Sequence, residues 1–282
     1  MRRPPHARRT VSCLAALFSL LCLMPPGATR AQSDLTPLQR EIRRQSARIS
    51  SGDTEERRDA VMRLGAMGRP ESSRAVAVAL GDASAVVRAT AARAVTGLGP
   101  AEATALILPL LRDRDEFVRR EAAYALGLTR SPSGVAALVN LLQTDKKPEV
   151  RGAAAVALGQ IGDPSAAGAL AGALSRRLRR PGALNRVLRR NTDEDEFVRR
   201  SAAIALGQMA SGEGVQALVD ALSDPKAPDD VRREAARALG LIGDARAVPA
   251  LRAALTARDP YLSRIAFEAL RKIDPAGATR PA

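Results

Sequence analysis

The side chains that most often perform catalysis are scarce in this chain of 282 residues. Its one histidine is His6, and its two cysteines are Cys13 and Cys22. All three lie in the first 31 residues, a segment that resembles a removable leader. Without them, the rest of the chain lacks the usual nucleophile–base pairs and the imidazole and thiolate ligands of metal sites. The sequence therefore predicts no catalytic residue, no metal site, no cofactor and no small-molecule substrate.

Carboxylates are the remaining groups that could hold Ca²⁺ or act as acids and bases. They are densest in Asp193–Glu196 and at Asp113, Asp115 and Glu116. Both clusters precede a predicted helix, where acidic side chains cap the first N–H groups and favour the helix dipole. We expect both clusters to be structural.

The first 31 residues are typical of a secretory signal peptide. Four arginines near the N-terminus precede an uncharged, mostly apolar run from Val11 to Met24, which Pro25 ends. That run is shorter than the roughly 20 residues that span a bilayer. We expect cleavage near Ala31, export, and a mature protein that is periplasmic or secreted. Loss of the five leader arginines lowers the net charge from +14 to +9.

A motif with a period of 31 to 33 residues recurs through the rest of the chain. Its clear copies read Val-Arg-Arg, then Ala-Ala, then Ala-Leu-Gly, starting at Val118, Val198 and Val231. The motif arginine or its counterpart recurs at steps of 31, 31, 32, 48, 33 and 31, at Arg57, Arg88, Arg119, Arg151, Arg199, Arg232 and Ser263. Such a period is typical of stacked supersecondary repeats, and the one long step marks an insertion.

Each copy predicts a pair of helices. Val118, Ala122 and Leu126 lie at i, i+4 and i+8, on one face of an α-helix. Gly-Asp or proline after this helix ends it and begins a second, shorter helix. One such pair cannot bury its own apolar face, so the pairs must stack. Aspartates placed to cap the first helix are Asp115, Asp195 and Asp229.

The motif resembles the HEAT repeat, in particular the short type first associated with phycobilisome lyase subunits. The resemblance implies an all-α, armadillo-like fold, a right-handed α-α superhelix of about seven helix pairs, with an opening helix around Leu38–Ile49 as the first partner. It also implies that the Val-Arg helices line the concave face and that motif Asp and Arg side chains link adjacent repeats. The copies depart from the motif at Glu56, Thr96 and Ser263. We expect a signal peptide at 1–31, a solenoid at 32–273 and a flexible tail at 274–282.

Enzymes are known among proteins of this resemblance, including bilin lyases and the di-iron deoxyhypusine hydroxylase, whose iron ligands come from His-Glu motifs. No such motif can occur after residue 31, because no histidine does. A lyase or hydroxylase activity would therefore rest on the fold alone, which does not establish function. We expect that the protein is not an enzyme.

The insertion, about residues 175–192, is strongly basic. Without its seven arginines the net charge falls from +9 to about +2. Leu184, Val187 and Leu188 have the spacing of a short basic amphipathic helix, which suits an acidic protein or an anionic membrane surface. The alternative is a solvated loop that Asp193–Glu196 neutralise internally. The arginines are Arg176, Arg177, Arg179, Arg180, Arg186, Arg189 and Arg190.

A second candidate surface follows the motif helices. Positions one residue after the motif arginine are mostly arginine, and positions five residues after it have an apolar centre flanked by charge. Such a surface could receive a peptide or helix with apolar anchors and acidic groups. The alternative is a set of ordinary exposed positions, with Glu121 and Glu234 pairing the arginines. The motif-helix row comprises Arg120, Tyr124, Val156, Arg200, Ile204, Arg233 and Arg237.

The sequence thus favours an exported, non-catalytic scaffold that binds another protein through its concave face and its basic insertion. An envelope-associated protein that binds anionic lipid or polysaccharide through the insertion is the alternative. Nucleic acid would suit the basic patch chemically, but export disfavours it. Deleting residues 176–190 separates the first two hypotheses, because lipid binding should vanish while groove-mediated protein binding should survive.

Overall fold

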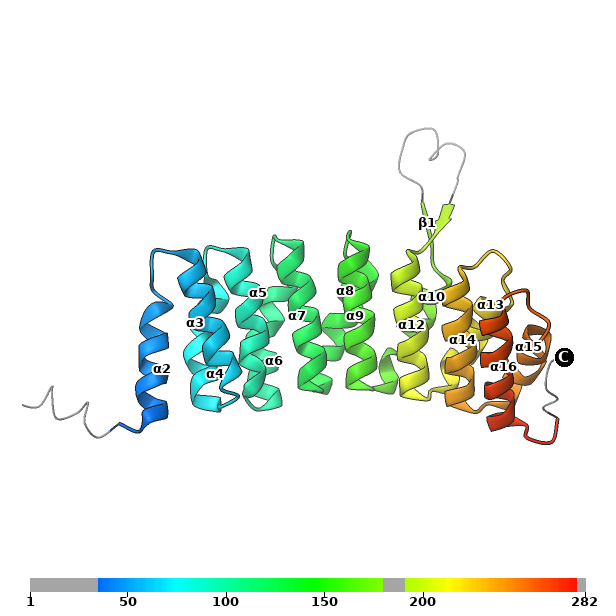
Figure 1. Ribbon diagram of the computed structural model, residues 1–282. Helices are drawn as coiled ribbons and strands as arrows, with labels where there is room; N and C mark the ends of the chain where they lie inside the picture. Colours follow the sequence, from blue (N-terminus) through cyan, green and yellow to red (C-terminus); the bar gives the residue numbers. More distant parts are fainter. Residues whose placement is uncertain (1–34, 180–190, 278–282) are drawn as a thin grey trace, which may run out of the picture. The chain divides into compact units, whose positions relative to one another are not determined.

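The computed structural model describes residues 35–179 and 191–277, which are mostly helical (Figure 1). The predicted signal peptide, the centre of the insertion and residues 278–282 lie outside the described residues. The chain divides into two units, Met1–Arg44 and Gln45–Ala282, with the boundary inside helix α2 (Pro37–Arg48). Across the described ranges, no helix has both the length and the apolar character needed to cross a membrane.

The described part of the smaller unit is the start of α2, the predicted opening helix. The Thr36 hydroxyl accepts the backbone N–H of Gln39 at 3.2 Å, and the Gln39 amide oxygen accepts the N–H of Thr36 at 2.8 Å. This reciprocal arrangement is a capping box, and it fixes where the helix begins. Leu38, expected to be apolar packing surface, is 42% exposed.

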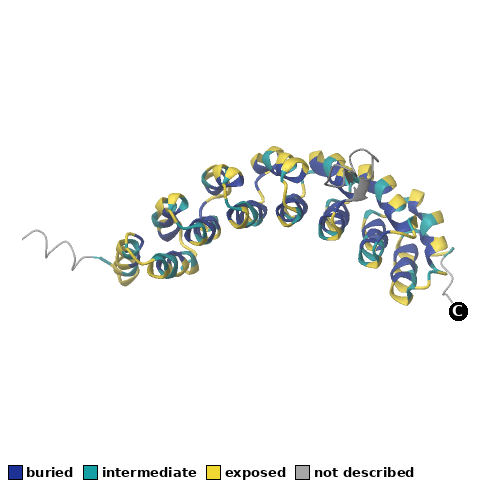
Figure 2. Ribbon diagram, turned by 90° about the horizontal axis from the view of Figure 1, so that it is seen from above, coloured by how far each residue is buried: buried dark blue, intermediate teal, exposed yellow. Residues whose placement is uncertain are grey.

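The larger unit contains two layers of helices whose buried sides face each other (Figure 2). Helices of the first layer carry the motif, and each packs on the next: α3 (Thr54–Ala66), α5 (Ala85–Ala94), α7 (Glu116–Thr129), α9 (Pro148–Ile161), α12 (Glu196–Met209), α14 (Asp229–Ile242) and α16 (Pro260–Ile273). The second layer comprises α4 (Pro70–Val76), α6 (Pro100–Ile107), α8 (Val135–Thr144), α10 (Ala167–Ser175), α13 (Val215–Ser223) and α15 (Val248–Ala254).

Each second-layer helix packs on the motif helix that follows it. This gives six pairs among the described residues, and α2 with α3 completes the predicted seven in chain order. The predicted all-α solenoid is confirmed. Short 3-10 segments begin or end the second-layer helices: η1 (Ala77–Gly81), η3 (Leu108–Arg112), η4 (Pro132–Gly134), η5 (Pro164–Ala166), η6 (Gly212–Gly214) and η7 (Ala245–Ala247). One more, η2 (Val95–Gly97), continues the motif helix α5.

The predicted apolar face of the motif helix is the core. In α7, Val118, Ala122, Ala125 and Leu126 are fully buried, and Thr129 is nearly so. Burying a valine or leucine side chain contributes about 1.5–3 kcal/mol. Because alanine dominates the rest of this face, the layers pack closely without large aromatic side chains.

The motif glycine allows neighbouring motif helices to touch. A Cβ atom on Gly207 of α12 would lie 2.9 Å from both Cα and Cβ of Ala238 in α14, closer than real Cβ contacts. In the copy that has Thr96 at this position, the motif helix ends early, at Ala94. The Ala-Leu-Gly part of the motif is therefore a helix-packing signal.

The ends of the motif helices are mostly as predicted. Asp115 and Asp195 are N-caps that accept the backbone N–H groups of Phe117 at 2.8 Å and Phe197 at 2.9 Å. The prediction for Asp229 was wrong by one position. Pro228, with an extended backbone, is the cap residue of α14, and Asp229 is the first helical residue. There its carboxylate can still favour the helix dipole.

Two short antiparallel strands, one at the start and one at the end of the insertion, pair between α10 and α12. Strand β1 (Arg177–Arg179) pairs with β2 (Asn191–Asp193), and Leu178 lies opposite Thr192. The sequence did not predict these strands, because three residues are too few to show an alternating pattern. The predicted amphipathic helix around Leu184 lies outside the described residues.

The predicted tail has a described beginning. Asp274 is the first residue after α16, and its carboxylate accepts a hydrogen bond from Arg252 Nη2 at 2.8 Å. The same carboxylate accepts the backbone N–H of Gly277 at 3.0 Å. The first residues beyond the last helix are thus tied to α15.

Candidate functional site

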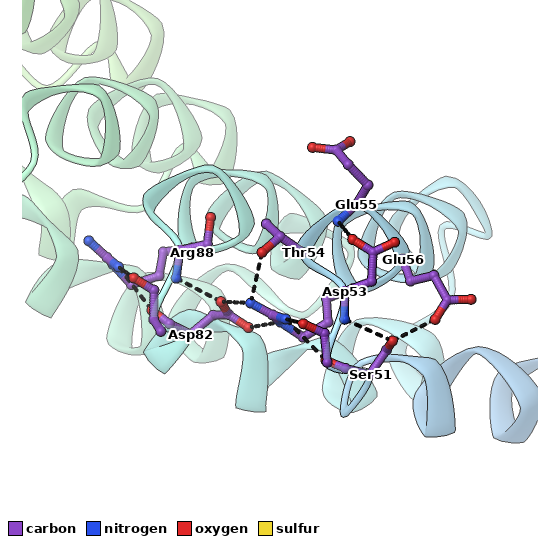
Figure 3. Close-up of polar contacts among 11 residues, drawn as sticks. Ser51, Asp53, Thr54, Glu55, Glu56, Asp82 and Arg88 are labelled. Carbon is purple, nitrogen blue, oxygen red and sulfur yellow. Dashed lines mark hydrogen bonds and ion pairs between the residues drawn. The ribbon is translucent and has the colours of Figure 1, made fainter.

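Motif arginines link neighbouring repeats in a ladder of ion pairs, whose first rungs are drawn in Figure 3. Arg57 donates to both carboxylate oxygens of Asp82, at 2.7 Å and 3.0 Å, and to the backbone carbonyl of Ser51 at 3.0 Å. Arg88 repeats the pattern with Asp113, at 2.7 Å and 2.8 Å, and with the carbonyl of Asp82 at 2.9 Å. Each arginine therefore contacts both the loop before its own helix, through a backbone carbonyl, and the next repeat, through an aspartate.

The ladder continues across the insertion. Arg119 donates to Asp145 at 2.7 Å, as in the earlier rungs. Arg151 instead pairs with Glu194, which lies beyond the insertion and has a fully buried side chain. For these first four rungs, the implied linking of repeats by motif arginines and acids is confirmed. The fourth rung shows that the insertion leaves the ladder unbroken.

The ladder changes register after the insertion. Arg199 and Arg232 direct Nε to backbone carbonyls, of Leu174 and Leu222, each at 3.1 Å. Arg200 of α12 pairs with Asp230 of α14 at 3.6 Å, and Arg233 of α14 pairs with Asp259, before α16, at 2.7 Å. In both cases the arginine one residue after the motif arginine reaches the next repeat.

These pairs set the protonation of the acids. The guanidinium bonds of Arg57 and Arg88 hold the pKa of Asp82 and of Asp113 below the ordinary aspartate value. Burial, the largest single effect, raises the pKa of Asp145, but the hydrogen bonds from Arg119 and from the backbone N–H of Lys147, together with the charges of Arg119 and Arg151, outweigh it and the net shift is downward. Asp82, Asp113 and Asp145 are therefore carboxylates at neutral pH, as bidentate pairing with arginine requires.

The apolar centre of the motif-helix row lies on three successive motif helices. Tyr124 of α7 and Val156 of α9 are half-buried, and Ile204 of α12 is 38% exposed. Burial raises the pKa of the Tyr124 hydroxyl, and the charge of Arg120 partly opposes this. The three side chains present apolar surface together with a neutral hydroxyl.

Of the row arginines, Arg237 is exposed and the other three are partly exposed, and all four already have acidic neighbours. Ion pairs join Arg120 to Glu121 at 3.3 Å and Arg237 to Glu234 at 2.9 Å, so the pairing expected by the alternative interpretation is present. Three further pairs are Arg200 with Asp230 at 3.6 Å, between α12 and α14, Arg233 with Asp230 at 2.9 Å, within α14, and Arg233 with Asp259 at 2.7 Å. The row is thus a mixed-charge surface rather than a purely basic stripe.

A groove of about 400 Å³ lies on the first layer, between α3, α5 and α7. Met62 and Arg93 line it from the row position five residues after the motif arginine, and Phe117 lines it from two residues before that arginine. This groove was not predicted from the sequence. One pattern in the sequence could have indicated it. The chain has few aromatic residues, yet three of them occupy the same motif position, at Phe117, Phe197 and Tyr261.

The base of the insertion is held by acid. Arg176 Nη1 lies 3.5 Å from Glu194 Oε2 and donates to the carbonyl of Leu142 at 3.4 Å. The backbones of Arg177 and Arg179 form β1. Neutralisation by the acids after the insertion is therefore present at Arg176. The other predicted insertion residues, Arg180, Arg186, Arg189 and Arg190, lie outside the described residues.

In the described ranges, no three histidine, cysteine, aspartate or glutamate side chains gather as a metal site would require. The stacked helix pairs and the arginine ladder define an α-solenoid protein of the HEAT type. The family model for HEAT repeats matches residues 44–125, 104–180 and 225–281, and that for the PBS lyase HEAT-like repeat matches residues 198–224. The chain belongs to the HEAT-repeat family.

Solved structures share this architecture. The Escherichia coli protein YibA is 21% identical, with a TM-score of 0.57 over 95% of this chain and 99% of that one. An engineered protein is 26% identical, with a TM-score of 0.52 over 82% of this chain and 68% of that one. The complex of CpcE and CpcF of phycocyanin lyase from Nostoc sp. PCC7120 gives 25% identity and a TM-score of 0.48 over 85% and 88%. No curated protein matches the chain in sequence.

Proposed function

We propose that this protein is an exported, non-catalytic scaffold that binds another protein through the motif-helix row, with the basic insertion as a second contact. The family resemblance implies that this row lies on the concave face. One observation carries the proposal: Tyr124, Val156 and Ile204 present apolar surface at equivalent positions of α7, α9 and α12, three helices that pack side by side.

The spacing of the row suggests the kind of contact. Packed helices lie about 8–10 Å apart, so three successive anchors span roughly 20 Å. An extended segment covers that distance in about six residues, and a helix in about four turns. A partner segment of ordinary length could therefore touch all three side chains. Anchors of this type commonly supply most of the binding energy of an interface.

Charge is a weaker contribution to the proposed contact. The row arginines are at least partly exposed, and each has an acidic neighbour within 3.6 Å. An acidic partner would have to compete with these neighbours. Exposed charges are also screened by salt. We therefore expect apolar contact to fix the affinity, and charge to change mainly the rate of association.

The non-catalytic part of the proposal rests on composition. Residues 32–282 contain neither histidine nor cysteine. If the leader is removed near Ala31, the mature chain has no imidazole or thiolate with which to activate a nucleophile or bind a transition metal. Among the carboxylates that remain, Asp115 and Asp195 are helix caps, and Asp82, Asp113, Asp145 and Glu194 pair with the ladder arginines.

The proposal is tested by site-specific photocrosslinking of the full chain in its native cell. A photoreactive amino acid is introduced in place of Tyr124 or Ile204, and in place of Gln216, an exposed residue of second-layer helix α13, as the control. We expect a discrete protein adduct from the first two positions and not from Gln216. Identical adducts from all three positions, or none from Tyr124 and Ile204, would contradict the proposal.

A second candidate function is binding of anionic lipid or polysaccharide through the insertion. It is favoured by the seven arginines without an acid in residues 175–192. Replacing Arg180, Arg186, Arg189 and Arg190 with glutamine removes charge and leaves both strands intact. Co-sedimentation of this variant with phosphatidylglycerol vesicles should drop strongly if the insertion binds lipid. The crosslinks from Tyr124 should persist if protein binding by the row is separate.

A further inference from the structure

We infer that the groove between α3, α5 and α7 is a docking site for an acidic segment of another protein that inserts one large apolar side chain. This inference rests on the proposed function and deepens it, because it assigns the chemistry of the partner segment at one place on the surface. The residues that carry it are Arg58, Met62, Ala89, Arg93, Phe117 and Glu121.

The groove has the size and lining of a side-chain pocket. Its volume is about 400 Å³, near the lower end of the range for small-molecule sites, roughly 300–1,000 Å³. Ala89 lines the groove and is 1% exposed. Met62 and Phe117, which also line it, are 51% and 37% exposed. Met62 and Phe117 therefore add exposed apolar surface to the hollow, and apolar surface rimmed by polar residues often marks an interaction site. One large aromatic or aliphatic side chain would fit in the space and leave room for its backbone or a neighbouring residue.

A neighbouring repeat suggests why this hollow stays open. Phe197 is the counterpart of Phe117, and Gly152 is the counterpart of Ala89. A Cβ atom on Gly152 would lie 2.1 Å from a ring carbon of Phe197, so that ring occupies the space over the glycine. Ala89 carries the methyl group that Gly152 lacks. The ring of Phe117 therefore cannot settle into the same place.

The rim of the groove is cationic. Arg58 and Arg93 have side chains 41% and 64% exposed, and the Arg120 guanidinium lies 5.1 Å from the centre of the Phe117 ring. Two acids face them: Glu55 pairs with Arg58 at 2.9 Å, and Glu121 lies 3.5 Å from Arg93. One positive charge remains in excess. The Arg93 contact is long, so this guanidinium can turn toward a carboxylate of a partner with little loss.

The position of the groove favours a protein segment as occupant. Met62 and Arg93 occupy the same motif position as Tyr124, Val156 and Ile204. The groove is therefore a continuation of the motif-helix row onto α3 and α5. A partner chain that lies along the row would reach the groove next, and its acidic residues would meet Arg93 while an apolar residue enters between Met62 and Phe117.

The test begins with a random library of displayed 12-residue peptides, selected against the full mature chain. We expect enrichment of peptides with one large apolar residue flanked by Asp or Glu. Fluorescence anisotropy of the selected peptides should then show at least a tenfold loss of affinity for Met62→Asp and for Arg93→Glu. Leu241→Asp is the matched control for Met62, because Leu241 is equally exposed at 52% outside the row, and Arg258→Glu is the control for charge.

Several results would overturn the inference. These are the absence of such a consensus, enrichment of basic peptides, or equal losses in the control variants. Self-association of the chain that Met62→Asp abolishes would assign the groove to a second copy and also overturn it. The two proposals can fail separately. Crosslinks from Tyr124 that persist with Met62→Asp, alongside unchanged peptide affinity, leave the scaffold proposal standing and remove only the groove.

Discussion

Substitution of Arg88 tests whether the arginine ladder holds the solenoid together. Arg88 donates two hydrogen bonds to Asp113, at 2.7 Å and 2.8 Å, and two to the backbone carbonyls of Asp82 and Ala83, at 2.9 Å and 3.0 Å. Its side chain is 9% exposed and that of Asp113 is 11% exposed. In Arg88→Ala, the nearly buried carboxylate of Asp113 would lose the arginine that balances its charge and keep only the backbone N–H of Asp115 as a donor.

The expected loss is large for a single residue. Removing one partner of a buried ion pair costs about 3–5 kcal/mol, because the remaining charge is left unpaired. We expect the free energy of unfolding of Arg88→Ala to fall by about that amount. Because both side chains are slightly exposed to water, the loss should lie near the lower end of this range. Urea unfolding of the mature chain, followed by circular dichroism, measures it. The slope with denaturant must stay constant for the comparison to hold.

Two further variants make this prediction specific. Arg114→Ala removes an exposed arginine next to Asp113 in the loop before α7. It should change the free energy of unfolding by no more than about 0.5 kcal/mol. Removing both partners, in Arg88→Met with Asp113→Leu, should cost less than the sum of the two single changes, because no charge remains unpaired. A loss below about 1 kcal/mol for Arg88→Ala, or strict additivity in the double variant, would refute the reasoning about the ladder.

Three other perturbations follow from the same geometry. Gly207→Ala places a methyl group 2.9 Å from Ala238 and should lower the free energy of unfolding by about 1–3 kcal/mol, whereas Gly172→Ala, with no neighbour within 4 Å of the added Cβ, should stabilise the protein in thermal unfolding. Ala210 ends α12 in the left-handed region at φ 50°, so Ala210→Gly should raise the free energy of unfolding by about 0.5–1 kcal/mol. At the equivalent cap Gly162, where φ is 74°, Gly162→Ala should lower it. Finally, the lowered pKa values of Asp82, Asp113 and Asp259 imply that these acids contribute stability that is complete above the unfolded-chain pKa of about 4 and is lost as pH falls through the lower folded values. Denaturant titrations at pH 7, 4 and 3 should show this loss, and a stability that rises on acidification would contradict it.

Much of the fold follows from local rules that the sequence displays openly. The period of the motif sets the number of helix pairs, and the offsets of Val118, Ala122 and Leu126 identify the buried face. The caps at Asp115 and Asp195 follow from side-chain chemistry that acts within three residues. These features could be predicted because each depends on neighbours in the chain.

The features that the sequence did not reveal depend on contacts between repeats. Glu194 takes the place of the ladder aspartate 43 positions from Arg151, on the other side of the insertion. The shift from Arg232 to Arg233 in the ladder depends on which guanidinium reaches Asp259. The groove beside Phe117 depends on a methyl group at Ala89 that its counterpart Gly152 lacks. No single-repeat pattern contains this information.

The most direct test of the account is the affinity between the purified mature chain and the protein captured by crosslinking at Tyr124. Isothermal titration calorimetry should show binding at least tenfold weaker for a variant that combines Tyr124→Ala with Ile204→Asp, while its helical content and unfolding midpoint stay near those of the native chain. Unchanged affinity in that variant would contradict the claim that the row binds the partner. A purified chain that turns over a substrate would contradict the broader claim that the protein acts by binding alone.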